Sequence, residues 1–114
     1  MTSVDEKTEE CEVETGEWPR FLEEFRRQHE RNPATIEIRS ATGRLIQAKT
    51  GRLLAIGMND EQHPEHAYVE LEEVLHGSAI HIIASPGRIT VRQRDGCQEL
   101  GITSVDGRKT VLLA

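Results

Sequence analysis

Apolar positions near the start of the chain repeat with the period of an α-helix. Charged residues fill the positions between them, so the helix would be polar on one side only. Pro19 suits a first helical turn and Pro33 marks a stop, which predicts a helix over about residues 19–31. Four large side chains form its single apolar stripe, at spacings i, i+3, i+4 and i+7: Trp18, Phe21, Leu22 and Phe25.

From Ala34 onward the pattern changes to short β-branched alternations separated by glycine and turn dipeptides. This texture predicts an antiparallel sheet of six to eight strands, with 41–44 and 50–52 as tight turns. The fold class is therefore α+β, mainly β, with the helix docked on a β-meander or a small, partly closed barrel. The predicted strands cover 35–40, 44–50, 52–58, 67–73, 79–85, 88–94, 98–105 and 109–114.

Two Asp-Gly pairs, at 95–96 and 106–107, are signals for two-residue hairpin turns and predict the register of the last three strands. Apolar side chains then meet on one face and polar side chains on the other, with Leu112 on the outer face. The predicted opposite pairs include Arg92 with Glu99, Ile89 with Ile102, Leu100 with Leu113 and Thr103 with Thr110.

Charge divides the chain into two parts. The net charge of −6 lies in residues 1–17, and the remainder has equal numbers of acidic and basic side chains. The sequence therefore predicts a disordered acidic tail over 1–16 and one domain over 17–114. A neutral body argues against general nucleic-acid binding, and no run resembles a membrane span or a secretory signal, so we expect a cytoplasmic protein. Cys11 and Cys97 fit free thiols in a reducing compartment.

Histidines provide one set of candidate ligands. His63 and His66 lie with carboxylates in the predicted loop 60–66, where they could bind zinc, although their spacing does not match a known zinc motif. His81 lies in a strand whose two faces are both apolar; if Ile80 and Ile82 point inward, His81 lies on the outer face.

A second candidate surface is a row of arginines on one strand face, formed by Arg88, Arg92 and Arg94. Such a row could bind an anion or an acidic partner. Because Glu99 is predicted to lie opposite Arg92, a solvated face with a cross-strand ion pair explains the same pattern.

Several short motifs follow one another in an order and at spacings that resemble those of a known family. Over 17–113 the chain resembles the short bacterial proteins of domain of unknown function family 5335. That resemblance implies a helix-plus-sheet domain with no established activity or cofactor, and it places 60–66 in a variable loop. Ile80 stands where the family often has an acidic residue before the histidine. The motifs are Glu17-Trp18, Phe21-Leu22, Ile36 to Ile38, Leu53 to Gly57, His81 to Ile83, Pro86, Ile89, Val91, Asp106-Gly107 and Thr110 to Leu113.

No assembled catalytic set is visible, so the leading hypothesis is a non-enzymatic interaction or ligand-binding module without a cofactor. Its partner would be another protein, or a second copy bound through an open sheet edge. One alternative is a metal or small-molecule binding protein that uses the histidines of 60–66 and His81. Another is a small enzyme whose acid or base is His81 or His76.

Overall fold

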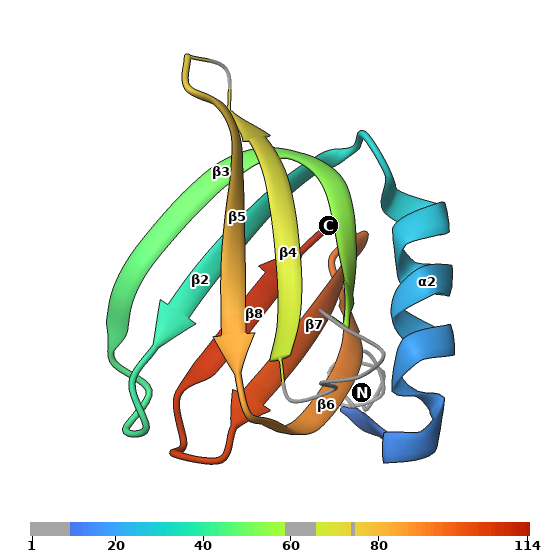
Figure 1. Cartoon of the computed structure of the whole chain (residues 1–114), viewed down its shortest axis with the longest axis vertical. Helices are drawn as coiled ribbons and strands as arrows, with labels where there is room; N and C mark the ends of the chain where they lie inside the picture. The colour runs from blue at the N-terminus through green and yellow to red at the C-terminus, as the bar shows by residue number, and fades with distance from the viewer. Residues whose placement is uncertain (1–9, 59–65, 74) are drawn as a thin grey trace.

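The computed structural model describes residues 10–58, 66–73 and 75–114, and shows one helix packed on an antiparallel sheet (Figure 1). The predicted class, α+β and mainly β, is confirmed. The elements are β1 (Cys11–Val13), the 3₁₀ turn η1 (Thr15–Glu17), α2 (Trp18–His29), β2 (Pro33–Arg39), β3 (Leu45–Met58), β4 (His66–Glu73), β5 (Gly77–Ala84), β6 (Pro86–Arg94), β7 (Cys97–Ser104) and β8 (Lys109–Leu113).

Helix α2 forms as its apolar stripe predicts. Trp18, Leu22 and Phe25 are buried against the sheet, and Phe21 is half-buried beside them. The helix ends two residues earlier than expected, because Arg31 adopts a positive φ of 69° that stops the helical path. The turn that follows docks on β3, where Arg31 donates a backbone hydrogen bond to the Leu53 carbonyl.

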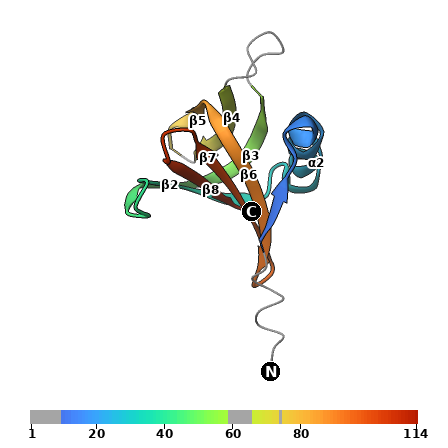
Figure 2. The same ribbon diagram turned by 90° about the horizontal axis from the view of Figure 1, so that it is seen from below.

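The sheet is one continuous surface that bends into two layers along β3. Its strand order is β1-β6-β7-β8-β2-β3-β4-β5, so β3 belongs to both layers. The first half of β3 pairs with β2 and the second half with β4. Figures 1 and 2 show β3 arching from one layer into the other, which brings β4 and β5 over β7 and β8.

Gly51 lies at this bend, inside a strand of 14 residues rather than in the tight turn predicted for 50–52. A Cβ atom at Gly51 would lie 2.5 Å from the backbone oxygen of Glu72. Glycine is therefore needed here because the backbones of β3 and β4 approach each other closely, and close backbone approach is a common reason for a glycine inside a strand. The sequence pattern does not distinguish that use from a turn.

The helix covers one open side between the two layers, and the sheet does not close into a barrel. In Figure 2, α2 lies beside β3 and β6, on the side away from β5. Leu22 and Phe25 join Leu53, Ile56 and Ile89 in one buried cluster. The core is thus made by the inner faces of both layers and the apolar stripe of the helix. Of the two predicted alternatives, the open sheet is the one observed.

The two C-terminal hairpins differ in how well the sequence predicts them. The first is confirmed: Arg92 lies opposite Glu99, and Asp95 and Gly96 both have the positive φ that its two-residue turn requires. The second register is wrong by one residue, because the loop has three residues, 105–107, closed by a hydrogen bond from Ser104 to the Arg108 carbonyl.

This shift exchanges the faces of the last strand. Leu112, predicted on the outer face, lies opposite Leu100 and is buried, while Leu113 lies opposite Glu99 on the outer face. Thr103 lies opposite Lys109 instead of Thr110. A one-residue error in loop length inverts every side chain of a strand, because side chains alternate between faces.

Part of the predicted disordered tail is ordered. Cys11–Val13 forms strand β1, which pairs with β6 so that Val13 lies opposite Ile89. The indole Nε1 of Trp18 donates a hydrogen bond of 3.0 Å to the Val13 carbonyl and ties β1 to the helix. The prediction for residues 1–9 lies outside the described residues. Within the described part, no helix is long and apolar enough to span a membrane.

Candidate functional site

Strand β5 forms one edge of the sheet and carries exposed apolar side chains. It pairs with β4, and the described residues place no strand on its other side. Ile80 is 59% exposed and Ile82 is 54% exposed, whereas Ile83 is buried. The arrangement with Ile80 and Ile82 inward is therefore wrong, because pairing with β4 sets His81 opposite the buried Val69 and turns the even-numbered residues outward.

The free edge of β5 lacks the features that usually protect an edge strand. Its eight residues pair with β4 without a bulge, and it contains neither proline nor any lysine, arginine, aspartate or glutamate. Proteins commonly place lysine, proline or a bulge on such edges to prevent pairing with another chain. The β5 edge thus presents free backbone donors and acceptors beside two exposed isoleucines.

His81 faces the space between the two layers, near Lys49 and Glu73. Burial lowers the pKa of His81, and the positive charge of Lys49 lowers it further, while Glu73 acts in the opposite direction. The imidazole is therefore neutral at pH 7. The Nζ of Lys49 lies 3.8 Å from Oε2 of Glu73, and neither this oxygen nor Nε2 of His81 has a hydrogen-bond partner within the described part of the protein.

The predicted histidine ligands are not brought together. His66 begins β4 opposite Ala84 and shares the outer face with Tyr68, so His66 and His81 lie on opposite faces of the β4–β5 pair. His63 lies outside the described residues. Among residues 10–58, 66–73 and 75–114, no three His, Cys, Asp or Glu side chains are grouped so that they could hold a metal ion.

The predicted arginine row forms part of a hollow on the outer face of the β6-β7-β8-β2 layer. The buried carboxylate of Glu99 accepts hydrogen bonds from Arg92 Nε at 3.1 Å and from Arg94 Nη1 at 2.7 Å. Burial alone would raise the pKa of Glu99, but the hydrogen bonds from Arg94 and Arg92 outweigh it and lower the pKa below its ordinary value. Glu99 is therefore ionised and holds both guanidinium groups in place.

This hollow, which we call the basic pocket, has a volume of 360 Å³. Its charged side chains come from β2, β6, β7 and β8, and β8 also contributes two apolar side chains to its lining. Arg88 is not part of it and pairs instead with Glu12, at 3.3 Å. The pocket is lined by Glu37, Arg39, Arg92, Arg94, Glu99, Lys109, Val111 and Leu113.

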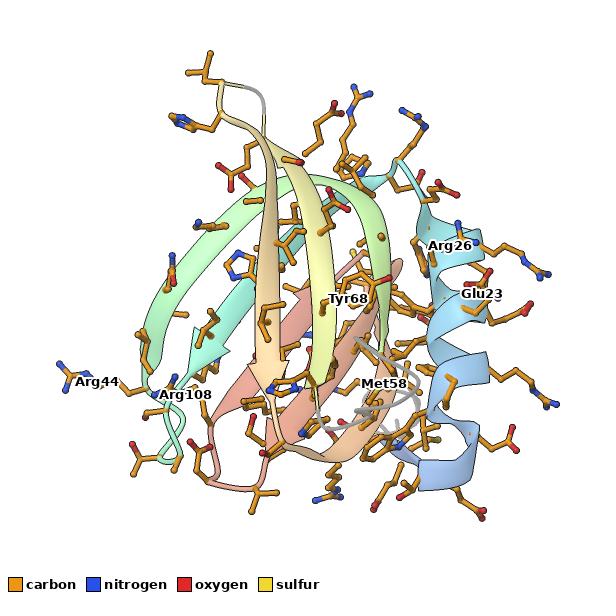
Figure 3. The ribbon with its side chains drawn as sticks, viewed as in Figure 1. Glu23, Arg26, Arg44, Met58, Tyr68 and Arg108 are labelled. Atoms are coloured by element: carbon orange, nitrogen blue, oxygen red, sulfur yellow. The ribbon has the colours of Figure 1, made fainter. Side chains whose placement is uncertain are left out.

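Two loops of the same construction lie beside one another at the end of this layer. In both, a serine N–H donates to the carbonyl of an arginine four residues later: Ser40 to Arg44 and Ser104 to Arg108. A Cβ atom on Gly107 would lie 2.9 Å from the Cβ of Ala41, so the loops are in contact. Figure 3 shows Arg44 and Arg108 close together beside these loops.

A further cavity, of 480 Å³, lies between the start of α2 and the β5–β6 turn. Ser85 in that turn has a positive φ of 48°, a strained conformation for a residue with a side chain. The cavity lining is mainly apolar and comprises Thr15, Trp18, Pro19, Met58, Ser85, Pro86 and Gly87.

In a comparison with known proteins, no protein-family model, curated protein or solved structure matches the chain. The resemblance to domain of unknown function family 5335 remains a prediction from sequence.

Sequence reasoning found Arg92, Arg94 and Glu99 because one hairpin joins them. It missed Arg39, which reaches the same pocket through the pairing of β2 with β8. It also missed Lys109, because the wrong register of the β7–β8 hairpin placed that residue on the other face. The alternating pattern of 35–40 and 109–114 gives each strand a polar face. That pattern does not indicate that the two strands are neighbours.

Proposed function

We propose that this chain is an interaction module that self-associates by pairing the β5 edge of one copy antiparallel to the β5 edge of a second copy. The observation that carries the proposal is the unprotected edge itself, with Ile80 and Ile82 more than half exposed beside it. Exposed apolar side chains on a free strand mark surfaces that pair with another chain.

A second copy is the occupant that this edge fits best. A free antiparallel edge is complementary to itself across a two-fold axis, because each residue that presents an N–H and a C=O meets the same arrangement in its partner. β5 has no formal charge apart from the titratable His81, so two copies approach without like-charge repulsion at pH 7.

The side chains favour one register. A two-fold axis perpendicular to the sheet keeps the outer faces of both copies on the same side, so residues of the same face must lie opposite each other. Centring the axis on His81 sets Ile80 opposite Ile82 of the second copy, and Ala79 opposite its Ile83. Shifting the axis to Ile80 would instead set Ile82 opposite Ser78, which buries less apolar surface.

The test compares two lysine substitutions by light scattering coupled to gel filtration, at several protein concentrations. Wild type should show a dimer mass, and Ile82→Lys should shift it to monomer because lysine protects an edge. Ile46→Lys is the matched control, since Ile46 is 56% exposed on β3 and should leave the dimer intact. A monomeric wild type, or equal effects of the two lysines, would refute the proposal.

The register is tested separately by cysteine cross-linking in a chain whose own cysteines are replaced, Cys11→Ser with Cys97→Ser; both are exposed, so the replacements should not disturb the core. His81→Cys places two thiols opposite each other across the proposed axis and should give a covalent dimer under mild oxidation. Ile46→Cys should not. Cross-linking at position 46 and not at 81 would contradict the proposed pairing.

A further inference from the structure

We propose that the basic pocket binds a small organic phosphate, a phosphate monoester with an apolar body. The proposal does not depend on self-association, because the pocket belongs to the β6-β7-β8-β2 layer and the β5 edge to the other. Its first support is charge. Arg39, Arg92, Arg94 and Lys109 line the hollow with only two carboxylates, Glu37 and Glu99, while the body of the protein as a whole is neutral. A third carboxylate, Glu10, lies 3.9 Å from Lys109.

The arginines are held in place before any ligand arrives. Glu99 is 5% exposed and uses one oxygen for Arg92 and the other for Arg94. A buried carboxylate with two guanidinium partners contributes little net stability compared with apolar residues of the same volume. The structural effect of Glu99 is to hold the planar guanidinium groups of Arg92 and Arg94 at the pocket wall. Planar guanidinium groups match the geometry of oxyanions.

The same two arginines keep donors free for a ligand. Arg94 uses Nη1 for Glu99, which leaves Nε and Nη2, and Arg92 uses Nε and Nη2, which leaves Nη1. Arg94 is half exposed, so these groups can be reached from solvent. Arg39 donates from each of its three nitrogens, to Glu37 and to the Gly43 carbonyl, and contributes to the pocket mainly through its charge.

Lys109 completes the pocket from β8. Its stem lies over Gly101, where a Cβ atom would come within 2.9 Å of Cε, so glycine at 101 makes room for the lysine. Its Nζ lies 3.9 Å from Oε2 of Glu10, which is an ion-pair distance but too long for a hydrogen bond, so a ligand can take the place of Glu10 without breaking a hydrogen bond. The ion pair with Glu10 shows that the ammonium group of Lys109 attracts an anionic oxygen.

The ligand class follows from charge, apolar surface and size. The four cations of the lining exceed its two carboxylates by two charges, and Glu10 offsets one of these until a ligand displaces it. The excess of two charges matches a phosphate monoester at pH 7.5. Val111 and Leu113 add apolar surface to the lining, which inorganic phosphate cannot use. A volume of 360 Å³ lies within the range of small-molecule sites.

The experiment is isothermal titration of the full chain with phenyl phosphate, inorganic phosphate and benzoate at low salt. Phenyl phosphate should bind with millimolar or tighter affinity, and inorganic phosphate and benzoate each about tenfold more weakly, because one lacks the apolar body and the other the second charge. Lys109→Met keeps the stem over Gly101, removes the charge, and should weaken phenyl phosphate about tenfold. Arg20→Met, on the exposed face of α2, is the control and should leave the affinity unchanged.

Absence of heat with phenyl phosphate at millimolar concentration would overturn the proposal, as would equal effects of Lys109→Met and Arg20→Met. Equal affinity for phenyl phosphate and inorganic phosphate would overturn the role of the apolar side chains Val111 and Leu113. Equal affinity for benzoate would overturn the assignment of a dianion. Circular dichroism of each variant distinguishes lost binding from lost folding.

Discussion

The buried carboxylate of Glu99 gives the sharpest stability prediction. Glu99→Gln keeps the volume of the side chain but replaces one acceptor oxygen by an amide that cannot accept a hydrogen bond from a guanidinium. A hydrogen bond to a charged group contributes about 1.5–3 kcal/mol. Because Arg92 is 32% exposed and Arg94 is 51% exposed, water can replace part of the lost hydrogen bonding. We therefore expect the free energy of unfolding to fall by about 2 kcal/mol.

Urea unfolding followed by circular dichroism, together with thermal melts, measures this loss; for a domain of this size, about 2 kcal/mol corresponds to a fall in Tm of about 10 °C. Glu23→Gln is the matched control, because Glu23 also pairs with an arginine, Arg26, but on the exposed surface of α2 (Figure 3). It should leave the melt almost unchanged.

The pH dependence gives a second measurement on the same group. The folded pKa of Glu99 is below its ordinary value of 4.5, so its stabilising effect is complete above pH 4.5 and is lost as the pH falls below that value. Glu99→Gln should therefore flatten the stability profile in this acid range. If Glu99→Gln and Glu23→Gln melt alike and share the wild-type acid profile, the account of Glu99 is incorrect.

Two further predictions concern the bend and the space between the layers. Gly51→Ala should destabilise the fold by about 1–3 kcal/mol in urea unfolding, because its Cβ would lie 2.5 Å from the backbone oxygen of Glu72. An unchanged midpoint would show that the backbones of β3 and β4 can move apart here without cost. The pKa of His81 is lowered by burial and Lys49, with Glu73 opposing, so stability should fall as the pH drops below 6.5, where the unfolded histidine binds its proton first. His81→Gln should flatten that part of the profile; an unchanged slope would mean that His81 is solvated.

The sequence predicts local features of this fold well. The helical stripe from Trp18 to Phe25 and the Asp95-Gly96 hairpin depend on neighbours in the chain, and both are observed. The second hairpin failed because Asp106-Gly107 fits either a two-residue or a three-residue loop, and the choice decides whether Leu112 or Leu113 is buried. Local signals therefore predict that an element exists more reliably than which of its faces is buried.

Non-local features were beyond the reach of the sequence. Nothing in 10–14 indicates a strand, because Cys11–Val13 is short and acquires its structure from the edge of β6. The basic pocket is assembled from the consecutive strands β6, β7 and β8 and from β2, which is distant from them along the chain. The exposure of Ile80 and Ile82 was hidden for a similar reason: both faces of β5 are apolar, and only its pairing with β4 decides which face lies inside.

The pairing of β2 with β8 has a consequence for how the chain acquires its fold. β2 to β5 form successive antiparallel neighbours, as do β6 to β8, and each set can form early from local contacts. The two sets are joined by β2 and β8, whose residues Ile36 and Leu112 lie far apart along the chain. Closing that long loop costs entropy before any burial is gained, so we expect the docking of the two sets to limit the folding rate. Until residues 109–113 are in place, the outer edge of β2 is as open to another chain as the edge of β5 is in the finished protein.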